Sequence, residues 1–464
     1  MRKSAALLAS VAALVTTSAI AADLPSRKAA PVQYVRICST YGEGFFYIPG
    51  TETCIRIGGC AAYEWNYAQP YSRGDSTTGT RATGRIFLDA RTATEYGLLR
   101  AFVRYDVQRR NGSLFSGTSR GIGTAFTGTG VDFNGVAQTE VALNRAFVQL
   151  GGLTAGRSQS FFDFYAGDLE YVGTTAGSSI QTNLLAYTAS FGQGFSIALS
   201  IEDPVERRNV IGPIATQGRY AGSGMPDFVG VLRVEQDWGV GQLSGAIHQV
   251  RAVGTLTPAG VVGSAPGFAP GTEVGYAFNA GVQFNLPWAT GDQLWLQATY
   301  AKGASTYINS NPFGYAFGGG GAVGGLGALV FPDAFVVANG GAGSLSLPTM
   351  WGLTAAVQHY WTPTIRQALF GSYIKAEIPG SAFLAANAVA PGALNPVRDF
   401  DYWTVGTNVT WSPVKDLDIG AEINYLQFNT GNGGVFSAVT GDPITKIYRN
   451  DSAIVGRLKI QRDF

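Results

Sequence analysis

The sequence predicts an all-β fold, a transmembrane antiparallel β-barrel of about 16 strands. Three observations lead to it: a secretory leader, a composition poor in charge, and hydrophobic alternation with a period of two. The leader is the segment 1–22, in which Arg2 and Lys3 precede the apolar run 5–15 and a small-residue cleavage signal ends near Ala21. We therefore expect an exported protein.

The composition limits the class of protein. Only 14% of the 464 residues are charged, against about 25% in soluble domains. Outside the leader, no apolar run approaches the roughly 20 residues of a membrane helix. Composition alone leaves a Gly-rich secreted all-β protein such as an adhesin as an equal alternative. The net charge of +1 gives no long-range attraction to nucleic acid, so we expect no nucleic-acid partner.

Period-two alternation recurs along the chain, for example over 99–107, 402–411 and 417–428. In the last of these, one face carries Leu417, Ile419, Ala421, Ile423 and Tyr425, and the other carries Asp418, Gly420, Glu422 and Asn424. Such alternation indicates strands that are exposed to two different environments.

The connections between these segments alternate in length. Short ones lie at 96–97, 151–152, 192–194, 239–241, 288–291, 362–364 and 414–416. Long ones lie at 68–80, 111–138, 159–182, 204–226, 253–272, 304–346, 379–400 and 430–450. Seven short and eight long connections imply 16 strands. A bacterial barrel has short periplasmic turns and long extracellular loops, whereas a sandwich has no reason to alternate in this way.

Strand number and the closing strand bear on function. Barrels of 16 to 18 strands leave an aqueous channel. The last strand ends on Phe464, the kind of terminal aromatic that the barrel-assembly machinery reads, and we expect that machinery as a partner.

The three cysteines are Cys38, Cys54 and Cys60. In an oxidising compartment one pair is expected to form a disulfide. Cys38 and Cys54 flank a Gly/Pro-containing loop, whereas Cys60 lies inside the first strand with lumen parity, so we predict a Cys38–Cys54 bridge and a free Cys60. Residues 23–53 then form a periplasmic N-terminal segment, and 54–464 form the barrel.

Three stretches resemble the alphaproteobacterial porin family: residues 38–59, residues 146–165 with Gly156-Arg157-Ser158-Gln159, and the final strand to Phe464. The resemblance covers essentially the whole mature chain. It implies a trimer of barrels in the outer membrane, in contact with lipid and lipopolysaccharide, with the third long loop folded into each lumen. The strand number itself predicts a passive, water-filled channel for small hydrophilic solutes and ions. The sequence departs from the family pattern at Cys60 and Ala62, where a bulky or basic residue is expected.

The third long loop, 159–182, carries three acids among many aromatic residues: Asp163, Asp168 and Glu170. Arginines with lumen parity lie on the first strands: Arg56, Arg85, Arg91, Arg100, Arg104 and Arg145. Acids facing bases across a narrow gap would create a transverse field that orients polar solutes. Two alternatives stay open: a surface loop with ordinary acids, and arginines that only neutralise acids of the wall.

Other functions are less well supported by the sequence. A solute-selective channel would need an aromatic slide or a specific site in the lumen, and a structural or adhesive barrel would need a plugged lumen. His248 and His359 stand in no nucleophile motif and far from the cysteines, so we expect neither an enzyme nor a metal or other cofactor. The Gly-rich run 318–321 lacks the Lys-Ser/Thr of a phosphate loop. The role of loop 304–346 stays open.

Overall fold

The computed structural model describes residues 36–69, 77–112, 138–209, 211–212, 219–253, 255–257, 260–262, 270–309, 332–337, 344–380, 399–429, 435–436, 447–448 and 450–464. The expected leader, the Gly-rich run 318–321 and parts of several long connections lie outside the described residues. Among the described residues, no helix is long and apolar enough to cross a membrane.

Eighteen strands share one hydrogen-bonded sheet. Two of them, β1 (Phe46–Tyr47) and β10 (Arg219–Tyr220), are two-residue additions, which leaves 16 barrel strands. These are β2 (Cys54–Ala68), β3 (Thr78–Thr94), β4 (Gly97–Arg110), β5 (Gln138–Leu150), β6 (Leu153–Gln159), β7 (Gln181–Gly192), β8 (Phe195–Glu202), β11 (Asp227–Gln236), β12 (Gly239–Val253), β15 (Thr272–Asn285), β16 (Gln293–Lys302), β19 (Thr349–Thr362), β20 (Ile365–Glu377), β21 (Phe400–Val414), β22 (Leu417–Asn429) and β25 (Asn450–Asp463).

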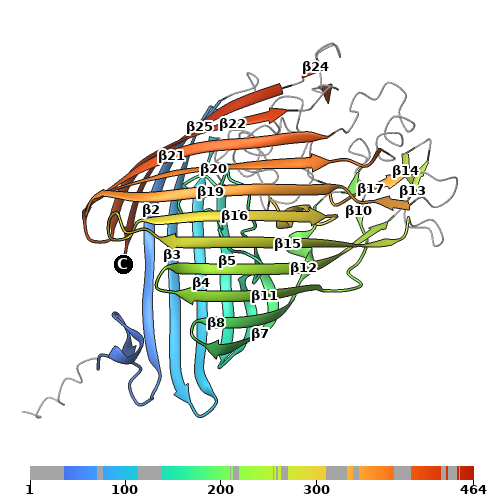
Figure 1. Cartoon of the computed structure of the whole chain (residues 1–464). Helices are drawn as coiled ribbons and strands as arrows, with labels where there is room; N and C mark the ends of the chain where they lie inside the picture. Colours follow the sequence, from blue (N-terminus) through green and yellow to red (C-terminus); the bar gives the residue numbers. More distant parts are fainter. Residues whose placement is uncertain are drawn as a thin grey trace, which may run out of the picture.

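The barrel is closed by its first and last strands. Each strand pairs antiparallel with its neighbours in sequence, and β25 pairs with β2 from Cys60↔Asp463 to Ala68↔Val455. The chain end extends this seam, because the backbone N–H of Gly59 donates to the Phe464 carbonyl at 3.0 Å and the N–H of Phe464 donates to the Gly59 carbonyl at 3.1 Å. The predicted fold class, strand number and alternation of connections are confirmed (Figure 1).

Burial is inverted relative to a soluble protein. Apolar side chains such as Leu199 and Leu243 point outward and are 68% and 56% exposed. Polar side chains such as Asn424 and Thr182 point inward and are 0% exposed. The period-two alternation of each strand therefore separates an apolar exterior from a polar interior.

Exposed aromatic residues gather where the strands meet the short connections, at what we call the short-turn end. They include Tyr96, Phe191, Trp238, Trp288, Trp361, Trp411 and Phe464. Such a belt is typical of a barrel at a membrane–water interface.

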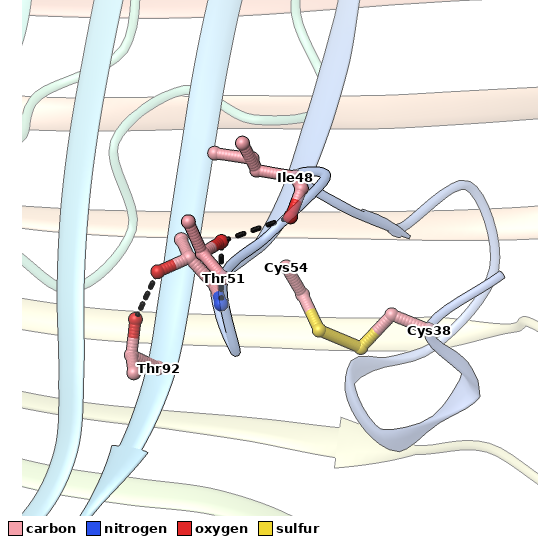
Figure 2. Close-up of a disulfide and its surroundings, with 6 residues drawn as sticks. Cys38, Ile48, Thr51, Cys54 and Thr92 are labelled. Carbon is pink, nitrogen blue, oxygen red and sulfur yellow. Dashed lines mark hydrogen bonds between the residues drawn. A yellow bond between two sulfur atoms is a disulfide. The ribbon is translucent and has the colours of Figure 1, made fainter. Parts of the chain in front are cut away.

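The described N-terminal segment lies beside the start of β2 (Figure 1). Cys38 and Cys54 form the predicted disulfide (Figure 2), and Cys60 is free and buried. Thr53 and Thr92 join this segment to β3 through their hydroxyl groups, 2.9 Å apart.

Short elements lie outside the barrel wall. They are η1 (Ser39–Tyr41), η3 (Pro204–Arg207), β9 (Ile211–Gly212), β13 (Thr255–Thr257), β14 (Gly260–Val262), η5 (Ser305–Tyr307), β17 (Ala334–Val337), β18 (Ser344–Ser346), β23 (Val435–Phe436) and β24 (Ile447–Tyr448). In Figure 1, β13, β14 and β17 gather at the end opposite the N-terminal segment. There β17 pairs with β18 and β9.

The disulfide predicts a specific thiol chemistry. Non-reducing peptide mapping should recover Cys38 linked to Cys54, and a thiol reagent should label Cys60 only after unfolding, because its side chain is 3% exposed. Replacing both bridged cysteines by Ser should destabilise the segment by about 3 kcal/mol, the chain-entropy value for a loop of this size. The measurement is limited proteolysis of the segment, with Cys60→Ala as the control. A bridge that contained Cys60 would contradict the assigned start of β2.

Candidate functional site

The connection between β6 and β7, residues 160–180, folds into the lumen. Polar side chains of the wall hold its backbone. Ser244 of β12 donates to the Phe162 carbonyl at 2.8 Å, and Gln297 of β16 accepts from the Tyr165 N–H at 2.9 Å. This loop therefore crosses the lumen past the strands that follow it in sequence.

The tip of the loop is fixed on β21, β22 and β25. The carboxylate of Glu422 accepts the backbone N–H groups of Tyr171 and Val172 at 2.6 and 2.8 Å. Asn408 donates to the Leu169 carbonyl at 2.6 Å, and Arg457 donates to the Tyr171 carbonyl at 2.5 Å. These contacts bridge more than 200 residues in sequence, so only the closed barrel brings them together.

Asp163 lies at the base of the loop and points into the protein. Its carboxylate is 3.1 Å from Arg207, and the two side chains are 1% and 0% exposed. It also accepts the Ile180 N–H at 2.8 Å. The Arg207 guanidinium lies 4.1 Å from the ring centroid of Tyr307. The structure thus differs from the expectation that Asp163 is an acid of the channel: here the side chain neutralises a buried cation.

Glu170 stabilises the fold of the loop itself. Its carboxyl group accepts from the backbone N–H of Thr174 at 2.9 Å and of Thr175 at 3.3 Å, and from the Tyr165 hydroxyl at 3.2 Å. Burial raises the pKa of Glu170 to about 7, although the Thr175 hydroxyl and these N–H groups favour the charged form. Its charge is therefore only partly present at neutral pH.

Asp168 is the acid of the three that is solvent-exposed. It interacts electrostatically with Arg145, which lies on β5. Of the three predicted acids, Asp168 is thus the one that interacts with an arginine of the predicted set.

The predicted arginines form a wall on β2 to β5. Asp106 binds Arg85 at 2.9 Å and Arg104 at 2.6 Å. Asp89 in turn binds Arg91 at 2.7 Å and Arg100 at 2.8 Å. Each carboxylate is shared by two guanidinium groups, so each cluster keeps one positive charge in excess.

Two further arginines of this wall bind neutral groups. Arg145 donates to the side-chain oxygens of Gln159 and Gln181 at 2.9 and 3.2 Å. The Arg56 guanidinium lies 5.6 Å from the ring centroid of Phe87. The alternative that arginines neutralise wall acids thus describes part of the set, and the wall as a whole stays positive.

Sequence reasoning missed the residues that anchor the loop: Arg207, Gln297, Asn408, Glu422 and Arg457. The sequence held part of the information, because Glu422 and Arg457 lie on the polar face of segments with period-two alternation. His248 has a related structural role. Its Nδ1 lies 2.8 Å from Asp227, which also accepts from the Tyr307 hydroxyl at 2.7 Å. His359 lies near the short-turn end, 2.6 Å from Asp292.

Residues 23–456 match the model of a family described as the porin subfamily. This chain belongs to that family. The match confirms the resemblance noted from the sequence and assigns the barrel to the outer membrane.

Curated relatives of this porin include Porin Omp2b of Brucella canis, 32% identical over 240 residues, and Porin Omp2b of Brucella suis, 34% identical over 250 residues. Each alignment covers 50% of this chain and 62% or 63% of the relative. The chain thus matches less than two thirds of the length of these relatives. Among solved structures, the outer membrane channel DcaP of Acinetobacter baumannii has a TM-score of 0.56 at 14% identity, and the alignment covers 90% of this chain and 99% of that one. This likeness concerns the fold.

The raised pKa of Glu170 predicts that the loop of this porin loosens as the pH rises. Because its pKa is about 7 in the packed loop and 4.5 ordinarily, packing favours the protonated form. That stabilisation is full below pH 4.5 and is lost as the pH rises through 7. Hydrogen exchange of the loop amides, corrected for intrinsic rates, should show protection falling by about tenfold from roughly pH 6 to 8.

The matched variants are Glu170→Gln, which should remove this pH dependence, and Glu206→Gln, which should keep it because Glu206 pairs with Arg157 outside the loop at 2.9 Å. A pH dependence that survives in Glu170→Gln would assign the titration to another group.

Proposed function

We propose that this porin forms a passive, water-filled channel for small hydrophilic solutes, with a preference for anions. The observation that carries the proposal is that the side chains of the arginine wall point into the lumen and remain partly exposed to water. The side chains of Arg85, Arg91 and Arg104 are 33%, 23% and 19% exposed. A plugged barrel, as a structural or adhesive role would need, is expected to cover them.

The proposed ion preference follows from a difference between the loop acids, which lose most of their negative charge, and the wall arginines, which keep an excess of positive charge. Two of the three loop acids have their charge reduced, Asp163 by Arg207 and Glu170 by its raised pKa. The wall keeps an excess of guanidinium groups, as described above. Charges within a Debye length, about 8 Å at physiological salt, dominate what a passing ion experiences, so the local excess outweighs the overall charge of +1.

The remaining partners follow from the surface of the barrel. We propose that the outward apolar side chains contact lipid, with lipopolysaccharide around the long loops, and that the barrel-assembly machinery recognises the strand that ends in Phe464. Residues 1–22 would be the export signal and 23–53 a periplasmic segment.

Reversal potentials in planar bilayers under a tenfold salt gradient test the charge arrangement. The wild type should prefer chloride over potassium. Arg104→Gln with Arg145→Gln should shift the potential towards cation preference, and Asp168→Asn should shift it further towards anions. All shifts should shrink at molar salt, where the Debye length is about 3 Å.

Arg109→Gln is the matched control. It removes an arginine from the same strand, but one that is exposed and donates to Thr139 at 2.9 Å. An unchanged potential in the double arginine variant would refute the wall as the source of selectivity, and a protein with no conductance would refute the channel.

We also propose a homotrimer. The outward faces of β2, β3 and β4 carry two cross-strand pairs of small residues, Ala61 with Gly84 and Ala90 with Ala101, on either side of Ile86 and Leu88. Small side chains let two surfaces approach closely, which favours a neighbouring barrel on this side.

Unheated detergent gels should show a species of about three times the monomer mass that collapses on boiling. Gly84→Arg should abolish it, because a long charged side chain prevents close approach. Ala355→Arg, on the outward side of β19, is the control for the cost of a charge on the lipid-facing surface, which is about 2–4 kcal/mol near the bilayer midplane. A monomer alone after mild extraction of the wild type would falsify the trimer while leaving the channel intact.

A further inference from the structure

A row of three phenylalanine rings crosses the arginine wall. Phe87, Phe102 and Phe147 come from β3, β4 and β5 with the same inward parity as the arginines. The ring centroids of Phe87 and Phe102 are 5.8 Å apart, and those of Phe102 and Phe147 are 5.3 Å apart. Interplanar angles of 21° and 19° make both pairs stacked. All three residues are partly exposed.

The row lies between two groups of guanidinium. Arg85, Arg104 and Arg145 each lie two residues from the phenylalanine of their strand, on the side of the long connections. Asp168 interacts electrostatically with Arg145 of this group. On the short-turn side, the Arg100 guanidinium lies 5.1 Å from the Phe102 centroid and 5.4 Å from that of Phe147. Arg56 lies 5.6 Å from Phe87. Every ring is thus within reach of a cation.

Packing alone explains this row poorly. A ring that only fills space belongs in the apolar exterior or a sealed core, whereas these rings stand among charged groups on the water side of the wall. The neighbouring backbone makes room for one of them, because a Cβ at Gly58 would lie 2.5 Å from the tip of the Phe87 ring. Aromatic faces and guanidinium planes offer stacking and cation–π contacts to flat solutes and charge to carboxylates.

We infer that the row Phe87–Phe102–Phe147, with the arginines on both of its sides, is a binding track for planar aromatic carboxylates. The ring of such a solute stacks on an exposed part of the row while its carboxylate binds the guanidinium groups. The inference rests on the proposed channel function and names the solute class that the channel favours. A saturated carboxylate of equal charge keeps the ionic contact but loses the stacking.

The test compares benzoate with cyclohexanecarboxylate in planar bilayers that contain the purified full-chain porin. Both are monovalent carboxylates on a six-carbon ring. Benzoate should reduce the chloride current at about fivefold lower concentration, the difference that one aromatic contact supplies. Phe102→Leu with Phe147→Leu should bring the ratio of the two half-blocking concentrations close to one and leave the chloride-over-potassium reversal potential unchanged.

Phe278→Leu is the matched control, because Phe278 points outward and is 58% exposed, and it should keep the fivefold ratio. If the double variant fails to fold, Phe87→Leu alone should lower the ratio. Equal blocking by the two acids in a conducting wild-type channel overturns the track and leaves the channel standing. A wild type without conductance overturns both.

Discussion

The structure depends on one constraint: a sheet that stands in hydrocarbon must leave no backbone N–H or C=O unpaired. The pairing of β25 with β2 satisfies it, and the reciprocal hydrogen bonds between Gly59 and Phe464 carry the seam to the last residue. Closure also fixes the parity of every strand. Once one side faces lipid, every second side chain must face the lumen, and the inverted burial follows.

The inward-facing polar side chains also need hydrogen-bond or ionic partners. Two groups of strands provide these partners in different ways. On β12, β16, β21 and β22, the inward side chains bind the backbone of the loop 160–180. On β3 and β4, they bind each other in clusters of two arginines and one aspartate. The loop is thus bound to strands other than β3 and β4, and this asymmetry underlies the cation-lined passage that we propose.

The base of the loop is held by a buried ionic network. Arg207 of η3 reaches Asp163 and stacks on Tyr307 of η5, and Tyr307 donates to Asp227 beside His248. A buried charge without its partner is expensive, so this network couples the inward loop to the outer connections that carry η3 and η5. The position of the loop therefore depends on residues outside the loop.

The sequence by itself determined the barrel, its 16 strands, the disulfide and the family, because alternation, connection length and motifs are local features that involve residues close together along the chain. It also gave the inward parity of the arginines on β2 to β5, since parity follows from position. It could not separate Asp168 from Asp163 and Glu170, or find Glu422, Arg457 and Arg207 as anchors of the loop. Those roles depend on contacts between residues as many as 286 positions apart. Only the closed barrel brings Asp163 to a cation and Glu422 to backbone N–H groups while it leaves Asp168 exposed to water.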